Sequence, residues 1–416
     1  MKIKIYRGTK EIGGNCIELT ADNGKVLWLD IGSPLSTINP DVSYTTKNNV
    51  DALLISHPHQ DHYGLVGNVD RSVPVYIGGV SLDLITATKI FLGKQLPTGN
   101  FKVIEPFKWF TVSDTFRVYP YLMDHSSPEA FSFVVEADGK QVFYSGDFRS
   151  TGSKGKLYYK IVFYPPKAID LFLTEGTMVE RSKQAYPDEK SVQEAINAVV
   201  RDQQNVTFVV SSAQNIDRLV SVVKACNSNK KKLVVDVYNA WVLDMVKKKA
   251  PNLPTIDWDN IWVYNHPRQL EKIAGVGFDG FKKRIDKKDI GNQIFSNPKD
   301  YIYFLRCPNV KLVDSLLPYG TINLIYSQWK GYLEEGHKTY CADIIQELVD
   351  SKKVAFRHIH TSGHATLFDL KRLAKAVNPK KIVPIHTENP VKMQQEFEKA
   401  GFTNVELWND GTYYTI

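Results

Sequence analysis

Cysteine is scarce in this 416-residue chain, and none of its four cysteines (Cys16, Cys226, Cys307 and Cys341) forms a CxxC pair. That pattern favours reduced thiols in a cytoplasmic protein. No apolar run approaches the roughly 18 residues that a membrane-spanning helix needs. The first residues alternate as in a strand, so we expect neither a membrane span nor a secretory leader.

Internal repeats and low-complexity linkers are also lacking. With 43% apolar and 23% charged residues, the composition is close to the globular average, which excludes disordered, collagen-like and coiled-coil proteins. The length predicts two or three domains at roughly 100–200 residues each.

The formal net charge of +7 is unevenly distributed. Residues 1–175 sum to about 0, residues 176–340 to about +6 and residues 341–416 to about +1. Basic runs at 230–232, 247–249 and 282–288 fall in the middle segment. Each run alone is typical of solvated surface, but together they suggest a basic domain suited to a polyanion.

The first 175 residues alternate between short β-rich runs and turns. Asp138-Gly139 lies between two runs and predicts a hairpin. Two other runs, 51–55 and 170–174, are almost continuously apolar, as expected where helices cover the outer face of a sheet. We predict strands at Lys2–Tyr6, Cys16–Thr20, Lys25–Asp30, Ala52–Ser56, Pro74–Ile77, Phe131–Ala137 and Gln141–Ser145.

After Glu175 helices and strands alternate. Pro187-Asp188 begins a helix with helical apolar spacing, and strands at 206–210 and 233–237 are each followed by a helix. This rhythm predicts a small parallel-sheet domain.

The last part of the chain contains longer elements. Thr366 is expected to cap a helix, Lys381–His386 to form a strand, and Asn389-Pro390 to open the last helix, which stops at Gly401. Residues 408–414 are expected to form a closing hairpin.

The most specific motif is Ser56-His57-Pro58-His59-Gln60-Asp61-His62, which directly follows a predicted strand. Imidazole nitrogens and carboxylate oxygens are zinc ligands, and a tight loop at a strand end can aim them at neighbouring ions. Crowding these groups beyond an apolar strand is unfavourable without a cation. A histidine-rich surface loop is the alternative.

This motif resembles the HxHxDH signature of the metallo-β-lactamase fold. Glu11-Ile12-Gly13-Gly14-Asn15 and Asp124-His125-Ser126-Ser127-Pro128-Glu129 resemble the ribonuclease J group of its β-CASP nuclease branch. Similar matches to the fold or the branch are found at Leu27–Gly32, Ser145–Phe148, Leu173–Thr177, His360–Ala365 and Pro384–Glu388.

The resemblance covers essentially the whole chain and implies an α/β fold, in which an inserted α/β β-CASP domain interrupts a metallo-β-lactamase αββα sandwich. The sandwich is then expected at residues 1–178 and 346–416, and the insert at residues 179–345.

The resemblance also implies two Zn²⁺ per chain, with Mn²⁺ or Mg²⁺ as alternatives. Asp147 would bridge the two ions, and Asp30 would orient a ligand imidazole through its free N–H. One ion would be held by His57, His59 and His125, and the other by Asp61, His62 and His386.

Two such ions can bridge a hydroxide and stabilise both the attacking and the leaving oxygen on phosphorus. In the resembled family His364 is the candidate acid or phosphate contact, and Glu175 would orient it. Together with Asp61 and Asp147, these are the expected catalytic residues. The hydroxyls and N–H groups of Thr361, Ser362, Gly363, His364 and Ala365 suit a phosphate before a helix.

Other polar residues have weaker signals. Ser211, Ser212 and Asn215 at a helix entrance resemble a backbone-binding segment, although such caps are as often structural. Tyr63, Phe148 and Arg149 suit either base stacking or core packing. His266, His337 and His358 have no ligand-like spacing, so we interpret them as structural or surface residues.

Two features depart from the ribonuclease J pattern. Thr387 stands where the family commonly has glycine, and a side chain there is expected to narrow the site or alter the contacts behind it. The chain also ends soon after its last motif, so we expect the family's extra carboxy-terminal domain to be absent. A homodimer is then the assembly to be tested.

The function that we predict is a zinc-dependent ribonuclease that cuts single-stranded RNA in the cytoplasm by 5′-exonuclease action, with endonuclease action as a second mode to be tested. A DNA-directed or structure-specific nuclease with the same site is the first alternative. A small ester or thioester hydrolase and a non-catalytic RNA-binding subunit are the others.

Overall fold

The computed structural model describes residues 1–35, 41–46, 49–95, 98–181, 184–201, 205–274, 278–335 and 338–416. The chain divides into two compact units. The first comprises Met1–Leu82, Pro97–Lys183 and Gly363–Ile416, and the second comprises Asp83–Leu96 and Gln184–Ser362. Within the described residues, no helix is long and apolar enough to cross a membrane.

The unit bounds differ from the expected domain boundaries at 179 and 345. The second unit extends to Ser362 because strand Val354–His358 (β17) pairs in parallel with Ile322–Tyr326 (β16). It also takes in Asp83–Leu96, which includes most of the helix Gly79–Phe91 (α2). Long-range strand pairing of this kind leaves no local signal in the sequence.

The first unit contains two sheets. The first sheet is antiparallel across its first four strands and parallel across its last four. In spatial order its strands are Tyr413–Thr415 (β19), Lys2–Arg7 (β1), Cys16–Thr20 (β2), Val26–Leu29 (β3), Ala52–Leu54 (β4), Pro74–Ile77 (β5) and Asn100–Val103 (β6). The short helix Gln60–Tyr63 (α1) follows β4.

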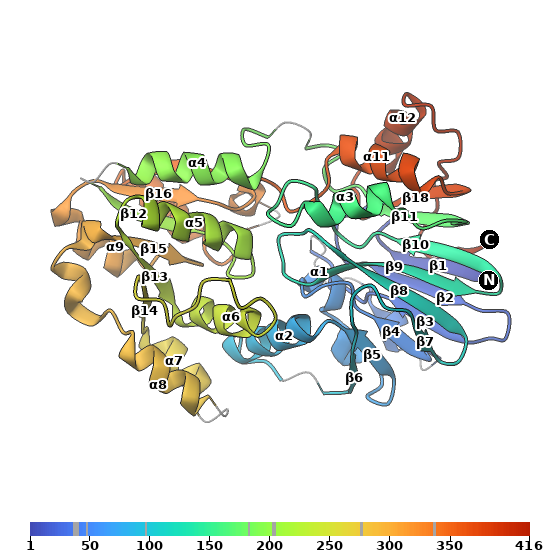
Figure 1. Cartoon of the computed structure of the whole chain (residues 1–416), viewed down its shortest axis with the longest axis horizontal. Helices are drawn as coiled ribbons and strands as arrows, with labels where there is room; N and C mark the ends of the chain where they lie inside the picture. Colours follow the sequence, from blue (N-terminus) through green and yellow to red (C-terminus); the bar gives the residue numbers. More distant parts are fainter. Residues whose placement is uncertain are drawn as a thin grey trace. The chain divides into compact units, whose positions relative to one another are not determined.

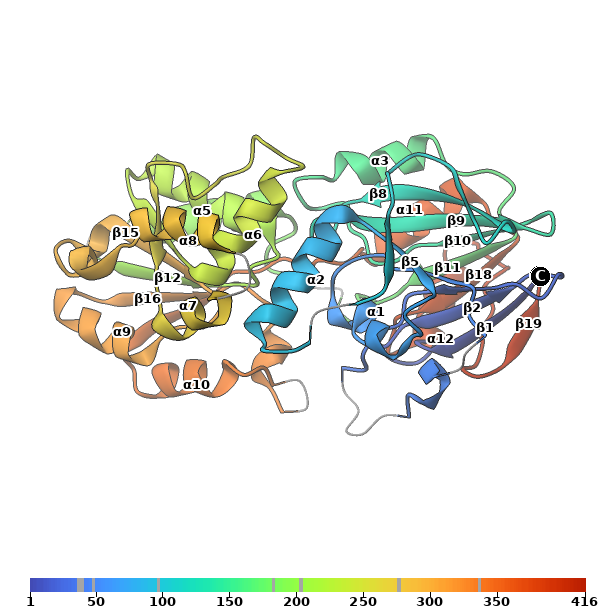
Figure 2. The ribbon, with the colours of Figure 1, turned by 90° about the horizontal axis from the view of Figure 1, so that it is seen from below.

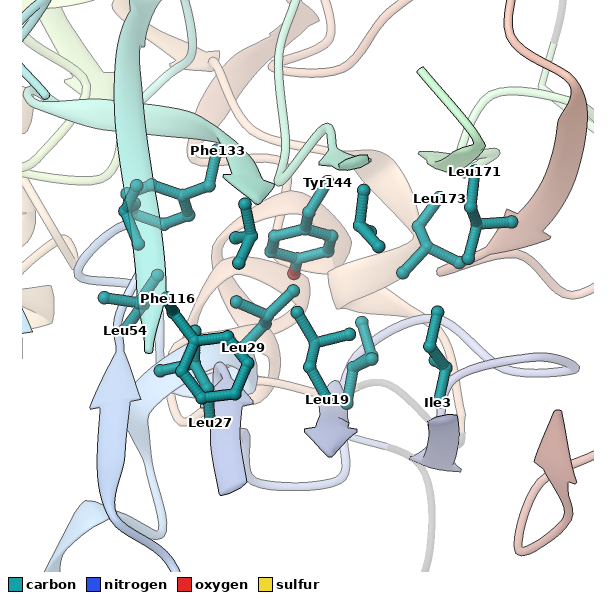
Figure 3. Close-up of a cluster of buried hydrophobic side chains, with 14 of the residues drawn as sticks. Ile3, Leu19, Leu27, Leu29, Leu54, Phe116, Phe133, Tyr144, Leu171 and Leu173 are labelled. Atoms are coloured by element: carbon teal, nitrogen blue, oxygen red, sulfur yellow. The ribbon is translucent and has the colours of Figure 1, made fainter. Parts of the chain in front are cut away.

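The second sheet lies face to face with the first. Its spatial order is Lys381–Ile385 (β18), Leu171–Glu175 (β11), Lys140–Tyr144 (β10), Ala130–Ala137 (β9), Phe116–Met123 (β8) and Phe110–Val112 (β7). The two sheets share one core, in which Phe133 and Tyr144 face Leu27, Leu29 and Leu19 (Figure 3).

The outer face of the second sheet is covered by three helices, Lys156–Phe163 (α3), Leu367–Val377 (α11) and Pro390–Glu398 (α12) (Figure 1). Phe143 and Phe172 point into this second core, whereas their neighbours Val142 and Leu171 point into the first. Strands buried on both faces explain the continuous apolar runs. The predicted αββα sandwich with an inserted α/β domain is confirmed.

The second unit is built on a fully parallel sheet. In spatial order its strands are Ile261–Tyr264 (β14), Lys232–Asp236 (β13), Tyr301–Leu305 (β15), Val206–Val210 (β12), β16 and β17. In the described part of this unit, seven helices accompany them besides most of α2: Glu189–Val200 (α4), Ile216–Ser228 (α5), Val237–Lys247 (α6), Pro267–Ile273 (α7), Asp279–Lys287 (α8), Val310–Leu316 (α9) and Ala342–Asp350 (α10).

A buried ion pair joins α4 to α5 in this unit. Arg218 and Glu189 are 0% and 4% exposed, and two guanidinium nitrogens donate to the carboxylate at 2.9 and 3.2 Å. The same guanidinium donates to the carbonyl of Ser327 at 2.8 Å and so ties both helices to the end of β16.

Several expectations are corrected by the tertiary structure. Cys307 and Cys341 form a disulfide, since the end of β15 meets the start of α10, whereas Cys16 and Cys226 remain buried thiols. The closing hairpin is absent from residues 408–416: β19 pairs instead with β1, which offers a free sheet edge.

The basic runs of the second unit are partly neutralised by ion pairs. Arg284 pairs with Asp244 and Asp257, and Lys247 pairs with Asp257. These pairs leave the net charge unchanged, because the count already includes both aspartates, but they make the runs at 247–249 and 282–288 less basic than their lysines and arginines alone suggest.

Candidate metal centre

The predicted ligands follow the carboxyl ends of strands in the first unit. His57 follows β4, His125 follows β8, Asp147 follows β10 and His386 follows β18. Glu175 is the last residue of β11. These strand ends meet at one edge of the sandwich, which is where α/β folds commonly place their sites.

The histidine-rich loop turns directly into α1. His59 precedes the helix, and Asp61 and His62 lie in its single turn. The loop is supported from behind by a close backbone approach: a Cβ on Gly13, which has φ +85°, would lie 2.9 Å from the Cβ of Asp61. This close approach is the steric reason for glycine at position 13.

A first group consists of His57, His59, His125 and Asp147, whose ligand atoms lie within 4.8 Å of one another. Nδ1 of His59 lies 3.0 Å from Nε2 of His57 and 3.1 Å from Nε2 of His125. Burial and neighbouring imidazoles lower the pKa of His57 and His125 well below the ordinary value. Burial also lowers the pKa of His59, to about 4. All three are therefore neutral, which is the form that binds a metal.

A second group consists of Asp61, His62, Asp147 and His386. Nε2 of His62 lies 3.2 Å from Oδ2 of Asp147, and Nε2 of His386 lies 3.3 Å from Oδ2 of Asp61. Burial by itself would raise the pKa of Asp147, but His386, His62 and His364 outweigh it and hold that pKa well below the ordinary value. Asp147 belongs to both groups, so an ionised carboxylate lies between them.

The residues fit a pair of divalent cations. Three of the rings are held through their outer nitrogen. Nδ1 of His57 contacts Ser56 Oγ at 3.0 Å, Nδ1 of His125 contacts the Gly363 carbonyl at 2.6 Å, and Nδ1 of His62 contacts Asp30 at 2.7 Å. A ring that is held through its outer nitrogen can present its inner nitrogen to a cation. Within the described residues, neither buried oxygen of Asp147 accepts a hydrogen bond.

His364 and Glu175 form a pair beside Asp147. Nδ1 of His364 lies 3.0 Å from the Glu175 carboxylate and 3.6 Å from Asp147. Burial would lower the pKa of His364, but the carboxylates of Glu175 and Asp147 outweigh it and raise that pKa. Glu175 is fixed in turn because it accepts from the backbone N–H groups of Phe148 and Ala365. The imidazole is therefore favoured in its protonated form.

Two family models match the chain. The metallo-beta-lactamase superfamily matches residues 11–216, and the Zn-dependent metallo-hydrolase RNA specificity domain matches residues 352–406. These matches include every residue of the two ligand groups. The chain belongs to the metallo-beta-lactamase superfamily. It is therefore a metal-dependent hydrolase by family.

Curated relatives of this superfamily member are named ribonuclease J. The proteins from Mycoplasma pneumoniae and Mycoplasma genitalium are each 24% identical over 93% of this chain and 68% of their own length. The Synechocystis protein is 23% identical over 99% of this chain and 65% of its own length. The chain thus spans about two thirds of their length.

The fold is shared with solved structures. A protein of unknown function from Enterococcus faecalis matches 100% of this chain and 99% of its own with a TM-score of 0.73, at 16% sequence identity.

The tertiary structure adds residues around the centre that the superfamily motifs did not single out. Oγ1 of Thr177 lies 2.8 Å from Nδ1 of His386 and holds that ring as Ser56 holds His57. The hydroxyl of Tyr144 donates to Asp30 at 2.5 Å. Thr177 lies inside the motif 173–177, so its position was the available signal. Nothing in the sequence around Tyr144 indicated its contact with Asp30.

The proposed phosphate cradle is split between the two units. Gly363, His364 and Ala365 belong to the first unit, whereas Thr361 and Ser362 belong to the second, where both donate to Oε1 of Gln184. A Cβ on Gly363 would lie 2.5 Å from Oγ of Ser126, so glycine lets this segment approach the ring of His125. Ala365 is completely buried.

The weaker substrate-binding candidates lie in the second unit and have structural partners. Asn215 caps α5, and Oγ of Ser211 donates to the Ser327 carbonyl. Ser212 is exposed. A role for them toward substrate stays a prediction.

Three aromatic or basic neighbours of the motifs are core residues: Tyr63, Phe148 and Arg149 are at most 1% exposed. Of the histidines without ligand-like spacing, His266 precedes α7 and the exposed His358 ends β17, whereas His337 lies outside the described residues.

Thr387 packs behind the centre. It is completely buried, and its Cβ would lie 2.9 Å from a Cβ on Gly176. The small residue at 176 therefore makes room for the side chain at 387.

Proposed function

We propose that this protein is a ribonuclease that hydrolyses phosphodiester bonds of single-stranded RNA, by 5′-exonuclease and also endonuclease action, with two Zn²⁺ per chain. The observation that carries the proposal is the double use of Asp147. It joins a three-histidine group to an Asp-His-His group, and the His364–Glu175 pair lies beside it.

The residues of the candidate centre have separate roles in this reaction. His57, His59 and His125 would hold one ion, Asp61, His62 and His386 the other, and Asp147 both. When bound, such a pair supplies an activated water nucleophile and positive charge for the oxygens on phosphorus. The protonated His364 donates to the leaving 3′-oxygen, while Glu175 holds its imidazole in place and favours the charged form.

RNA is the favoured substrate for two reasons. The segment 352–406, which contains His364 and His386, matches a domain described as conferring RNA specificity. The curated relatives that match most of the chain are named ribonuclease J. Zinc is favoured over Mn²⁺ and Mg²⁺ because five of the seven ligands are imidazoles.

The test is cleavage of end-labelled single-stranded oligomers by the metal-loaded protein. We expect 5′-phosphorylated RNA to be degraded to short products, and a matched DNA oligomer to be cut at least tenfold more slowly. Comparing 5′-phosphate with 5′-hydroxyl ends separates stepwise removal from internal cutting.

Other outcomes would overturn the proposal. Preferential cutting of DNA would make the protein a DNA-directed nuclease, and lactone or thioester hydrolysis without nuclease activity would make it a small-substrate hydrolase. RNA binding with fewer than one metal ion per chain and no cleavage would indicate a non-catalytic subunit. The cytoplasmic location and the homodimer stay predictions.

A further inference from the structure

Outside the candidate metal centre, the first unit carries a line of partly exposed aromatic side chains. We call it the aromatic face and define it by Phe107, Trp109, Tyr119, Tyr121, Tyr159 and Phe163. Its members lie just before β7, on β8 and on α3. Helix α3 packs on β8 and next to α11 (Figures 1 and 2). None of these residues belongs to the two ligand groups.

Four of the rings follow one another at short spacings, and two of them, Tyr119 and Tyr121, lie on β8. Tyr119 and Tyr121 alternate with the buried Val118, so both point away from the sandwich core. Their ring centroids lie 4.8 Å apart, and Trp109 extends the line at 5.2 Å from Tyr119. Phe107 continues it at 6.4 Å from Tyr121.

Helix α3 continues this line with exposed side chains. Tyr159 and Phe163 are one helical turn apart and therefore share a face. They are 38% and 67% exposed, and Trp109 is 42% exposed. Lys160, between them in sequence, places Nζ 4.1 Å from the Phe107 ring, and Phe107 in turn lies next to Tyr121 of β8.

Cations accompany the rings. The Arg372 guanidinium lies 5.0 Å from the Tyr159 ring, and that of Arg117 lies 4.7 Å from the Trp109 ring. Arg117 also pairs with Glu136. In the described part of the chain, neither Lys160 nor Arg372 has a carboxylate within ion-pair distance, so both offer uncompensated charge beside exposed rings.

This combination favours one class of ligand. Exposed rings give unpaired bases a surface for stacking, and cations beside them contact the phosphates. A protein–protein interface shares the enrichment in aromatic residues and arginine but is depleted in lysine, so Lys160 is the residue that favours a nucleic acid.

We propose that the aromatic face binds single-stranded nucleic acid outside the metal centre, with bases on Tyr159 and Phe163 and phosphates at Lys160 and Arg372. It is an additional binding surface, and it rests on the proposed function only for the nature of the strand.

The test is the affinity of the metal-loaded full chain for a fluorescein-labelled 30-nucleotide oligoadenylate RNA, measured by anisotropy. A His364→Ala background prevents cleavage of the probe. The variant pair Tyr159→Ala and Phe163→Ala should raise Kd at least tenfold, because stacking is lost at two positions. The conservative pair Tyr159→Phe and Phe163→Tyr keeps the rings and should keep the affinity within about twofold.

The salt dependence supplies a second readout. Removing both cations with Lys160→Gln and Arg372→Gln should reduce the slope of log Kd against log salt by about 1.4, since each phosphate contact on a single strand contributes roughly 0.7.

Two results would overturn the inference. One is an unchanged Kd and slope in both variant pairs. The other is a loss of self-association in sedimentation with unchanged RNA affinity, which would assign the face to a second copy of the chain.

The proposed function is judged separately, by cleavage of a five-nucleotide RNA with the wild-type protein. Binding through the aromatic face without such cleavage would contradict the proposed function but would still support this inference.

Discussion

The side-chain oxygen of Thr177 lies 2.8 Å from Nδ1 of His386, and both side chains are buried. The contact joins the segment after β11 to the residue after β18, 209 positions further along the chain. His386 also has a positive φ of 49°, a conformation that a non-glycine residue keeps only when its surroundings fix it. The orientation of this candidate ligand therefore depends on Thr177.

Removing the Thr177 hydroxyl should weaken metal binding. We expect Thr177→Val to lower the affinity of the second ligand group, which contains His386, for its ion by about 10–100-fold, as loss of a group that orients a ligand usually does. Competition with a chromogenic chelator measures the change. Thr177→Ser keeps the hydroxyl and is the matched control. Equal affinities in the two variants would show that the contact has no orienting role.

The pair formed by His364 and Glu175 should act in the chemical step. His364→Ala is expected to keep both ions, since the seven predicted ligands remain, but to lose about 10²–10⁴-fold in kcat. Metal content by mass spectrometry and single-turnover cleavage of labelled RNA separate the two effects. Glu175→Gln should show a smaller loss of kcat, because its amide still holds the ring but cannot favour the charged form. A metal-loaded His364→Ala protein with wild-type turnover would refute this role.

Metal binding at both ligand groups should depend on Asp147. Asp147→Asn weakens a ligand shared by the two groups, so the zinc content should fall below one ion per chain. Removing metal from the wild-type protein with EDTA should abolish cleavage and lower Tm, because bound ions stabilise only the folded state. As a control, Asp170→Asn changes a carboxylate of the same unit that pairs with Lys380. A fall in zinc content in that control would point to general destabilisation instead.

Gly176 and Thr387 should be energetically coupled. A Cβ at 176 would lie 2.9 Å from the Thr387 Cβ and 2.7 Å from the Met393 sulfur. Gly176→Ala is therefore expected to destabilise the protein by about 1–3 kcal/mol. Adding Thr387→Gly should recover part of that loss, which a double-mutant cycle in urea would measure as a nonzero coupling. Strict additivity would mean that the two positions do not compete for space.

The buried pair in the second unit predicts a different stability effect. Arg218→Met leaves Glu189 buried without its cation and should cost about 3–5 kcal/mol. Changing Glu189→Gln in the same chain removes the stranded charge and should restore most of the stability. Denaturation followed by tryptophan fluorescence compares the two. If the double variant is no more stable than Arg218→Met alone, the loss of stability comes from lost packing and not from the unpaired charge of Glu189.

The sequence by itself determined most local features of this protein. Periodicity placed the strands β5, β2 and β12 at their observed bounds, and the caps at Thr366 and Asn389 are where the local hydrogen-bond rules put them. The ligand candidates around His57 and His62 could also be recognised from the local sequence. Histidine and aspartate that crowd the end of an apolar strand have few purposes besides holding a cation.

Only the tertiary structure decided which distant groups meet. It paired β19 with β1 rather than with a neighbour, extended the second unit through β17, and brought Cys307 to Cys341. It also placed Thr177 behind His386 and the Gly363 carbonyl behind His125. Such contacts depend on how whole strands align, and a free hydroxyl or carbonyl is compatible with too many partners for the local sequence to select one.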